Sequence, residues 1–294
     1  MAILGAGGLL GTNLQHLAKN GWEVTALTRK DLNIPFELSH DAKLKFNSQF
    51  NLSEFDVVIN CIGLTNVDRC ESEADLCNFT NVQIPKILAQ MTLGTKTKLV
   101  HISTDHFKSQ LAAPRSEFVN VWGINEYGRS KLEAEELVLD TNPDALVVRT
   151  NFFGWGRKHR LSILDWMIKQ LEQDLQLDAF EDVLFTPISI FELFRLIEGL
   201  LEIKKFGIVN CSGSDSLSKY QFGKLVAEVF GLNSNLVAPI SIDSKGLLAL
   251  RPKYLSLDNA LAQKSLGLNV PSLAEMLEKC ASDRLWRDQI NLMD

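Results

Sequence analysis

The stretch GAGGLLG (residues 5–11) decides how this chain folds. The apolar residues AIL (residues 2–4) precede it, and the segment LLGTNLQHLAKN (residues 9–20) continues from it with apolar residues at helical spacing. Its glycines are spaced G-x-x-G-x-x-G, whereas the commonest dinucleotide-binding turn reads G-x-G-x-x-G. A turn that uses glycine only for close packing fits this spacing equally well. The sequence around the turn must therefore distinguish the two.

Strand-like and helix-like segments alternate through the first half of the chain. Short β-rich runs are expected to form strands, and segments with apolar residues every three or four positions are expected to form helices. This alternation is typical of βαβ units around a parallel sheet. The expected strands are 2–4, 22–27, 43–46, 56–62, 98–103 and 145–150, and the expected helices are 9–19, 73–93, 125–140 and 161–174. A long loop is expected over residues 104–124, and loops of that length usually carry function.

We therefore expect an α/β protein with a Rossmann-type, doubly wound parallel sheet and a smaller, interwoven α/β substrate-binding domain. The rhythm of the sequence changes after residue 150, but no flexible linker or internal repeat follows. Residues 1–151 and about 183–210 are expected to form the domain of the parallel sheet, and residues about 152–182 and 211–294 the smaller domain.

Composition narrows the function. A chain of 294 residues is long enough for one large α/β unit or two joined domains. With a formal net charge of −6 and no basic run, it is not expected to bind nucleic acid. No apolar stretch has the length of a membrane span and no signal pattern begins the chain, so we expect no membrane association and a cytoplasmic location. The five scattered cysteines form no C-x-x-C pair, so we expect reduced thiols and no metal site.

The glycine turn has the residues that a pyrophosphate site needs. Gly5, Gly8 and Gly11 allow a tight turn, close approach of the backbone to the phosphates and close packing of helix on strand. Leu9 and Leu10 begin the helix, whose unpaired N–H groups and dipole favour an anion.

The residues after the second expected strand indicate which dinucleotide binds. NAD sites tend to place an acidic residue there, against the ribose hydroxyls, whereas an arginine accommodates the extra phosphate of NADP. Here the stretch reads Thr28-Arg29-Lys30, without an acid. Arg29 and Lys30 therefore favour NADPH as cofactor, with NADH as the alternative if both are only solvated loop charges.

Tyr127 and Lys131 lie four residues apart in NEYGRSKLEAEE (residues 125–136), on one face of an expected helix. A phenol with a pKa of about 10 is a weak proton donor at neutral pH. A nearby ammonium group lowers that pKa and can also bind the nicotinamide ribose. An ordinary amphipathic helix is the alternative explanation.

The stretch HISTDHF (residues 101–107) ends the fifth expected strand, at the edge where parallel sheets bind ligands. A hydroxyl of Ser103 or Thr104 could there polarise a substrate carbonyl, with Asp105 beside it. Capping of the strand end by these hydroxyls is the competing explanation. His101 is expected to be a packed strand residue.

Taken together, the chain resembles the extended short-chain dehydrogenases/reductases, and among them the dTDP-4-dehydrorhamnose reductases. The similar stretches span nearly the whole sequence: GAGGLLG, DLNI, INCIGLTNVDRCE, the Asn81-Val82 pair, STD, EYGRSK, VVRTNFFG, CSGSDSLSKYQFGK and RPKYLSL.

The resemblance assigns roles to residues of this sequence. It implies that Thr104, Tyr127 and Lys131 form the catalytic triad. It implies further cofactor contacts at Asn60, Cys61, Ile62, Gly63 and Ser103. Substrate contacts are expected at Thr65, Val67, Asp105, Asn151, Phe152, Phe153, Arg160 and Tyr220, where Arg160 belongs to the basic cluster RKHR (residues 157–160).

Three segments depart from the family pattern. HFKSQ follows STD where the family has Y-V-F-D-G, FEDVLFTPIS replaces a stretch with glutamine, glycine, proline and threonine, and Phe152 replaces a tryptophan. The catalytic residues are therefore expected to be retained, while the substrate contacts do not transfer safely.

The expected activity is NADPH-dependent reduction of a 4-keto nucleotide-activated deoxysugar, for deoxysugar or surface-polysaccharide synthesis. One alternative is an epimerase or dehydratase of the same superfamily that retains NAD, and another is a non-catalytic, NADP-binding regulatory subunit. The expected partner is the nucleotide sugar, and the sequence leaves a homodimer open.

Overall fold

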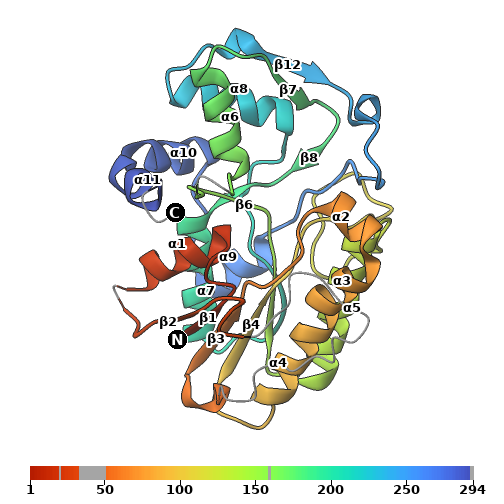
Figure 1. The fold of residues 1–294 in the computed structure, drawn as a ribbon, viewed down its shortest axis with the longest axis vertical. Helices are drawn as coiled ribbons and strands as arrows, with labels where there is room; N and C mark the ends of the chain where they lie inside the picture. The colour runs from red at the N-terminus through yellow and green to blue at the C-terminus, as the bar shows by residue number, and fades with distance from the viewer. Residues whose placement is uncertain (20, 33–50, 158–159, 292–294) are drawn as a thin grey trace.

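A fully parallel, six-stranded sheet forms the centre of the computed structural model, which describes residues 1–19, 21–32, 51–157 and 160–291 (Figure 1). Its strands are β1 (Ala2–Leu4), β2 (Thr25–Leu27), β3 (Val57–Asn60), β4 (Lys98–Ile102), β5 (Leu146–Arg149) and β10 (Gly207–Asn210). Their order in space is β10-β5-β4-β3-β1-β2. The chain passes from β1 to β2 and then returns to β3 on the other side of β1, so the sheet is doubly wound. The expected Rossmann-type α/β fold is confirmed.

Helices cover both faces of this sheet (Figure 1). One face carries α1 (Leu9–Ala18), α7 (Ile190–Glu202) and α9 (Ala260–Leu266), and the other carries α3 (Ala74–Asn78), α4 (Ile84–Thr92) and α5 (Glu126–Thr141). Successive strand residues point to opposite faces. Ile3 and Ile59 accordingly join the apolar cluster with α1 and α7, whereas Leu4 and Val58 join the cluster with α4 and α5.

The strand before the glycine turn is only three residues long, yet it is central. β1 lies between β2 and β3 and its residues have no exposed surface. The expected strand over 22–27 is shorter in the structure, because β2 pairs only where β1 offers a partner, from Ala2 opposite Thr25 to Leu4 opposite Leu27. The expected strand at 43–46 lies outside the described residues.

The expected helix over 73–93 is a continuous helical segment with a π turn inside it. The segment η2 (Phe79–Gln83) is π-helical and joins α3 to α4. Pro85 opens α4 and has no N–H to bond the carbonyl of Asn81, so regular α-helical bonding cannot pass this point. A short helix, α2 (Val67–Ser72), was not expected; Asn66 caps it by accepting a hydrogen bond from the N–H of Arg69, 2.9 Å.

A smaller layer lies beyond the carboxyl ends of the main strands (Figure 1). It contains three two-stranded sheets, formed by β6 (Phe152–Phe153) with β9 (Ile188–Ser189), β7 (Leu177–Phe180) with β12 (Val237–Ile240), and β8 (Leu184–Phe185) with β11 (Leu217–Ser218). Its helices are α6 (Ile163–Glu172), α8 (Lys219–Val229), α10 (Leu273–Ser282) and α11 (Arg284–Asn291), with the short helical turns η3 (Ser234–Leu236) and η4 (Ile242–Lys245). The helical turn η1 (Leu52–Glu54) belongs to the main layer, where it precedes β3. The segment 104–124 has no helix or regular strand, as expected.

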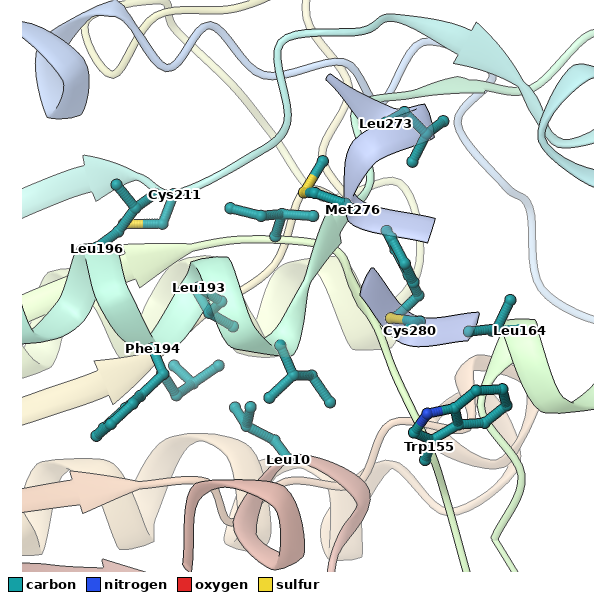
Figure 2. Close-up of a cluster of buried hydrophobic side chains, with 14 of the residues drawn as sticks. Leu10, Trp155, Leu164, Leu193, Phe194, Leu196, Cys211, Leu273, Met276 and Cys280 are labelled. Atoms are coloured by element: carbon teal, nitrogen blue, oxygen red, sulfur yellow. The ribbon is translucent and has the colours of Figure 1, made fainter. Parts of the chain in front are cut away.

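One apolar cluster joins the small layer to the main sheet. Leu10 of α1, Met276 of α10 and Trp155 belong to the same group of buried side chains (Figure 2). Asn13 of α1 adds polar ties to this junction, because it donates to the carbonyl of Trp155 (2.8 Å) and accepts from the indole N–H of Trp286 (2.9 Å). The helix that follows the glycine turn is thus anchored by both layers.

Candidate active site

The glycine turn has a shape that side chains would fill. Gly5 has a φ of +81°, and a Cβ there would lie 3.0 Å from the backbone of Cys61 at the end of β3. A Cβ on Gly11 would lie 2.4 Å from the carbonyl oxygen of Gly5. Gly8 caps α1 without a side-chain hydrogen bond, so the N–H groups of the first turn remain available to an anion. These residues fit a pyrophosphate, and Leu10, which is buried in the core, could contribute only its backbone.

Three arginines gather beside this turn. The pKa of Arg29, which follows β2, is lowered by burial and by the charges of Arg160 and Arg69. Arg160 also donates to the hydroxyl of Thr65, 3.2 Å. Arg160, expected to contact substrate, therefore lies near Arg29, which follows β2. Lys30 is exposed.

An acidic residue lies one position beyond the stretch that suggested NADPH. The carboxylate of Asp31 accepts hydrogen bonds from the N–H (2.7 Å) and the hydroxyl (2.6 Å) of Thr28. These bonds close the turn after β2 and leave Arg29 between the two residues.

The turn after β3 is held by two buried asparagines. Asn60 accepts a hydrogen bond from the N–H of Ile62, 3.1 Å. Asn81, in the π turn, accepts from the N–H of Leu64 (2.8 Å) and donates to its carbonyl (3.1 Å). Burial raises the pKa of the Cys61 thiol to about 12, so this thiol is unreactive at neutral pH. The sequence assigns Asn81 no role beyond the similarity of the Asn81-Val82 pair to the family, because several other polar residues share its helical segment.

Thr104 and Tyr127 meet at the carboxyl end of β4. The Thr104 side chain is near enough to Tyr127 to lower the pKa of its phenol, and the Thr104 oxygen accepts from the N–H of His106, 3.2 Å. Tyr127 lies in the first turn of α5, where Asn125 caps the helix by accepting from the N–H of Gly128, 2.7 Å. The arrangement places two hydroxyl groups where one carbonyl oxygen could accept from both.

Lys131 lies one turn further along α5 and is buried. Its Nζ donates to the carbonyl of Ile102 (2.7 Å) and lies 3.3 Å from Nε2 of His101. Burial lowers the pKa of Lys131 to about 8, while the negative charge of Glu135 raises it. Burial also lowers the pKa of His101 well below its ordinary value, so His101 is neutral. It is a packed strand residue, as expected, and also a neighbour of the lysine.

The expected effect of Lys131 on Tyr127 differs from the structure. We predicted that the ammonium group would lower the pKa of Tyr127. Instead the pKa of Tyr127 is raised, first by burial, with the charge of Asp105 adding to the rise and the Thr104 hydrogen bond opposing it. The reason is burial, which disfavours the charged phenolate more strongly than the Thr104 hydroxyl favours it. Tyr127 consequently keeps its proton at neutral pH.

A buried ion pair holds α5 against the sheet. Arg149 donates to both carboxylate oxygens of Glu135 at 2.6 to 3.0 Å, and both side chains are at most 5% exposed. The hydroxyl of Ser103 also donates to Glu135. Ser103, expected to contact the cofactor, therefore directs its side chain toward α5.

The residues expected to contact substrate divide into two groups. Asp105 is buried and accepts a hydrogen bond from Asn151, 2.6 Å, next to Thr104. Phe152 is half-buried in β6. Phe153, however, has no exposed surface and packs edge-on against Phe222, so its side chain supports the cleft from within the core and does not line it.

The remaining expected contacts lie at the edges of the site. Val67 is the first residue of α2 and is half-buried, and Thr65 is exposed. Tyr220 packs against the large apolar cluster and is half-buried. Among the described residues, Tyr220 forms no hydrogen bond or ring contact with Thr104 or Tyr127.

Two cations were missed. Arg115 is buried and donates to the carbonyls of Asp105 (2.7 Å), Leu255 (3.2 Å) and Phe107, so it holds the loop after Thr104 in place. Lys219 begins α8 with its Nζ 3.2 Å from the centre of the Phe185 ring. Each contact joins segments far apart in the sequence, and no local pattern indicated either.

The described ranges contain no group of three or more His, Cys, Asp and Glu side chains placed to hold a metal ion. Within the same ranges, none of the helices combines the length and apolar character that a bilayer crossing requires.

A doubly wound sheet, a glycine turn at the end of β1, and a Thr-Tyr-Lys set at the end of β4 define an extended short-chain dehydrogenase/reductase. More specifically, the family described as RmlD substrate binding domain matches residues 1–285, so the chain belongs to that family. The expected family is confirmed.

Individual relatives agree with this assignment. A dTDP-4-dehydrorhamnose reductase of Mycolicibacterium smegmatis is 30% identical over 270 residues, covering 88% of this chain and 78% of its own. A solved dTDP-4-dehydrorhamnose reductase of Clostridium acetobutylicum has a TM-score of 0.82 at 29% identity, covering 97% of this chain and 100% of its own. One of Bacillus anthracis, in complex with NADP, has a TM-score of 0.82 at 25% identity, covering 96% and 98%.

Proposed function

We propose that this protein is an NADPH-dependent reductase that converts the 4-keto group of a nucleotide-activated 6-deoxysugar to an alcohol. The observation that carries the proposal is the proximity of Thr104 and Tyr127 at the end of β4, with the buried Lys131 one helical turn beyond Tyr127. The names of the relatives support the class of substrate, and the NADP complex of the Bacillus anthracis structure supports the cofactor.

The residues that would hold the dinucleotide surround the ends of β1, β2 and β3. The glycine turn with the N-terminus of α1 takes the pyrophosphate, and Arg29 takes the extra phosphate of NADP. The turn at residues 60–63 lies against the nicotinamide half. When bound, NADPH supplies a hydride to the sugar carbonyl carbon.

The chain's own residues then handle the oxygen. Thr104 donates a hydrogen bond that orients the carbonyl, and Tyr127 donates the proton that turns the developing alkoxide into a hydroxyl. A buried tyrosine with a raised pKa holds its proton at neutral pH until that alkoxide forms. Lys131, whose pKa is about 8, is mostly protonated there and stabilises the phenolate that remains. The balance is one ketone, one NADPH and one proton consumed for one alcohol and one NADP⁺.

The two layers divide this work. Residues 1–151 and about 183–210 serve the cofactor, and residues about 152–182 and 211–294 serve the sugar, except that α9 packs on the main sheet. The strands β8 and β9 connect the two layers. They pair with β11 and β6 of the small layer, and the next element, α7, packs on the main sheet. A homodimer and a cytoplasmic location stay predictions from the sequence.

The test mixes the purified protein with NADPH and a panel of dTDP-, UDP-, GDP- and CDP-4-keto-6-deoxy sugars while the absorbance of NADPH is followed. At least one sugar should be reduced, and Tyr127→Phe should lower kcat by at least about 100-fold without weakening NADPH binding. Tyr254→Phe is the matched control, because Tyr254 is 48% exposed and outside the proposed site. If NADPH binds but no sugar is reduced, the proposal fails.

A further inference from the structure

A buried row of polar side chains connects Lys131 to the turn that follows β3. The Nζ of Lys131 lies 3.3 Å from Nε2 of His101, and the other ring nitrogen, Nδ1, lies 3.1 Å from the amide nitrogen of Asn60. His101 and Asn60 are opposite each other in β4 and β3. All three residues are at most 4% exposed, so these contacts, and not bulk water, satisfy their polar atoms.

The donor and acceptor in each contact can be assigned from the Asn60 end. The side-chain oxygen of Asn60 accepts from the N–H of Ile62, 3.1 Å, so its amide nitrogen faces His101. An amide nitrogen only donates, and Nδ1 of His101 must therefore accept and carry no proton. Burial and the charge of Lys131 lower the pKa of His101 well below its ordinary value. The ring is consequently neutral, with its one proton on Nε2.

This tautomer directs an N–H group at the ammonium group of Lys131. An ammonium group has no lone pair, so two donors face each other across 3.3 Å while Lys131 is protonated. When Lys131 loses a proton, its amine has a lone pair that accepts from Nε2–H, and a remaining N–H still donates to the carbonyl of Ile102, 2.7 Å away. The contact with His101 therefore favours the neutral amine over the ammonium group.

We propose that His101 is a positioning residue: oriented by Asn60, it presents Nε2–H to Lys131 and weakens the hold of this lysine on its proton. A histidine that served only for packing would be indifferent to the charge of Lys131. The consequence for turnover, that Lys131 loses its charge at a lower pH than it would without His101, rests on the proposed reductase activity. The assignment of donor and acceptor does not.

Four other titratable groups act on the charge of Lys131. The carboxylate of Glu135 in α5 and the thiols of Cys61 after β3, Cys70 in α2 and Cys77 in α3 all favour the ammonium form. Burial opposes them and lowers the pKa of Lys131 to about 8. His101 acts in the same direction as burial, but through one directed N–H group that a substitution can remove while the lysine stays buried.

NMR titration of the purified protein without substrate tests the assignment. The ¹⁵N signals of His101, identified by their absence in His101→Phe, should show the proton on Nε2 and none on Nδ1 near neutral pH. The ¹³Cε signal of Lys131 measures its pKa. His101→Phe keeps a buried ring and removes the N–H group, so this pKa should rise from about 8 to about 9, a tenfold change in the dissociation constant of the proton. A histidine that accepted from the ammonium group would give a fall in the pKa instead.

A second variant inverts the tautomer and keeps the ring. Asn60→Asp places a carboxylate, which only accepts, opposite Nδ1, so the proton should move to Nδ1 and Nε2 should accept from Lys131. The pKa of Lys131 should then rise further than in His101→Phe, because the new negative charge adds to the effect. His16→Phe is the matched control: His16 lies in α1, stacked on Trp286, and its replacement should leave the pKa of Lys131 unchanged.

The outcomes are distinct. If the proton of His101 lies on Nδ1 in the wild-type protein, or if His101→Phe leaves the pKa of Lys131 unchanged or lowers it, the inference is overturned. In the reductase assay, the alkaline fall of kcat should move to higher pH in His101→Phe while KM for NADPH stays the same. If the titrations give the expected values and no sugar is reduced, the proposed function fails and the assignment of His101 stands. If His101→Phe does not fold, the tautomer in wild-type protein and the titration of Asn60→Asp decide.

Discussion

Replacing Gly11 by alanine tests whether the first turn of the fold depends on glycine for packing. In an ordinary helix interior this substitution stabilises by about 1 kcal/mol, because alanine has the higher helix propensity. Here the new Cβ would lie 2.4 Å from the carbonyl oxygen of Gly5 and 2.8 Å from Cα of Ala6. Both are backbone atoms, so the strand-to-helix turn must move to accept the new Cβ. Overpacking costs about 1–3 kcal/mol, and we take the upper end, about 3 kcal/mol, because no side chain can yield instead. The net expectation is a loss of about 2 kcal/mol of the free energy of unfolding.

Urea unfolding followed by tryptophan fluorescence measures this loss, and NADPH titration measures the effect on the turn. Gly21→Ala is the matched control, because a Cβ there has no atom within 4 Å and the residue lies outside the proposed site. The control should change the free energy of unfolding by no more than about 0.5 kcal/mol. Gly11→Ala should also bind NADPH at least about tenfold more weakly. An increase in stability, or unchanged NADPH binding, would refute the packing argument.

Three further predictions concern charged residues of the site. Arg29→Ala should weaken binding of NADPH by about 10- to 100-fold and leave NADH binding nearly unchanged. Lys30→Ala, at an exposed position, should change the binding of neither dinucleotide. Equal losses for both dinucleotides in Arg29→Ala would contradict the assignment of Arg29 to the extra phosphate of NADP. Arg149→Met should lower the free energy of unfolding by about 3–5 kcal/mol, because it leaves Glu135 charged and buried without its partner. The double variant with Glu135→Leu should recover most of that loss, as measured by urea unfolding. As the pH rises through about 8, Lys131 loses its positive charge, so kcat should fall above that pH. The carboxylate of Glu135 raises the pKa of Lys131, so Glu135→Gln should move this fall to lower pH. An unchanged pH profile would show that another group titrates.

Local patterns were sufficient for five of the six strands of the main sheet; β10 (Gly207–Asn210) was not among the expected strands. The alternation of β-rich runs and helix-period segments predicted β3, β4 and β5, because a parallel strand buried on both faces is apolar along its length. The glycine turn placed β1 at the centre even though it has only three residues. Thr104 and Tyr127 could be paired from the sequence because the resemblance to a family supplied the contact that spacing alone does not.

What the sequence could not supply was contact between distant segments. Phe153 follows Phe152 in a stretch expected to contact substrate, but in a strand neighbouring side chains point to opposite sides, and the pairing of β6 with β9 decides which one faces the core. Lys219 lies over the ring of Phe185 because β11 pairs with β8. Arg115 approaches Asp105 across a loop in which no periodicity indicates a position. Each of these contacts depends on strand pairing or loop conformation that no local pattern specifies.

The Tyr127 and Lys131 pair shows how the same limit affects chemistry. Spacing of four residues on a helix correctly predicts that both side chains are on one face, and in water their interaction would lower the pKa of the phenol. Burial opposes this interaction, because it disfavours both the phenolate and the ammonium group. It is the largest cause of the raised pKa of Tyr127 and of the lowered pKa of Lys131. The raised pKa keeps the proton on Tyr127 at neutral pH, and it also makes Tyr127 a weaker acid than a free phenol. A lysine whose pKa is about 8 still carries the charge that the phenolate needs at neutral pH. The site is therefore better described as a protonated tyrosine with a cation behind it than as a tyrosine already made acidic by its neighbour.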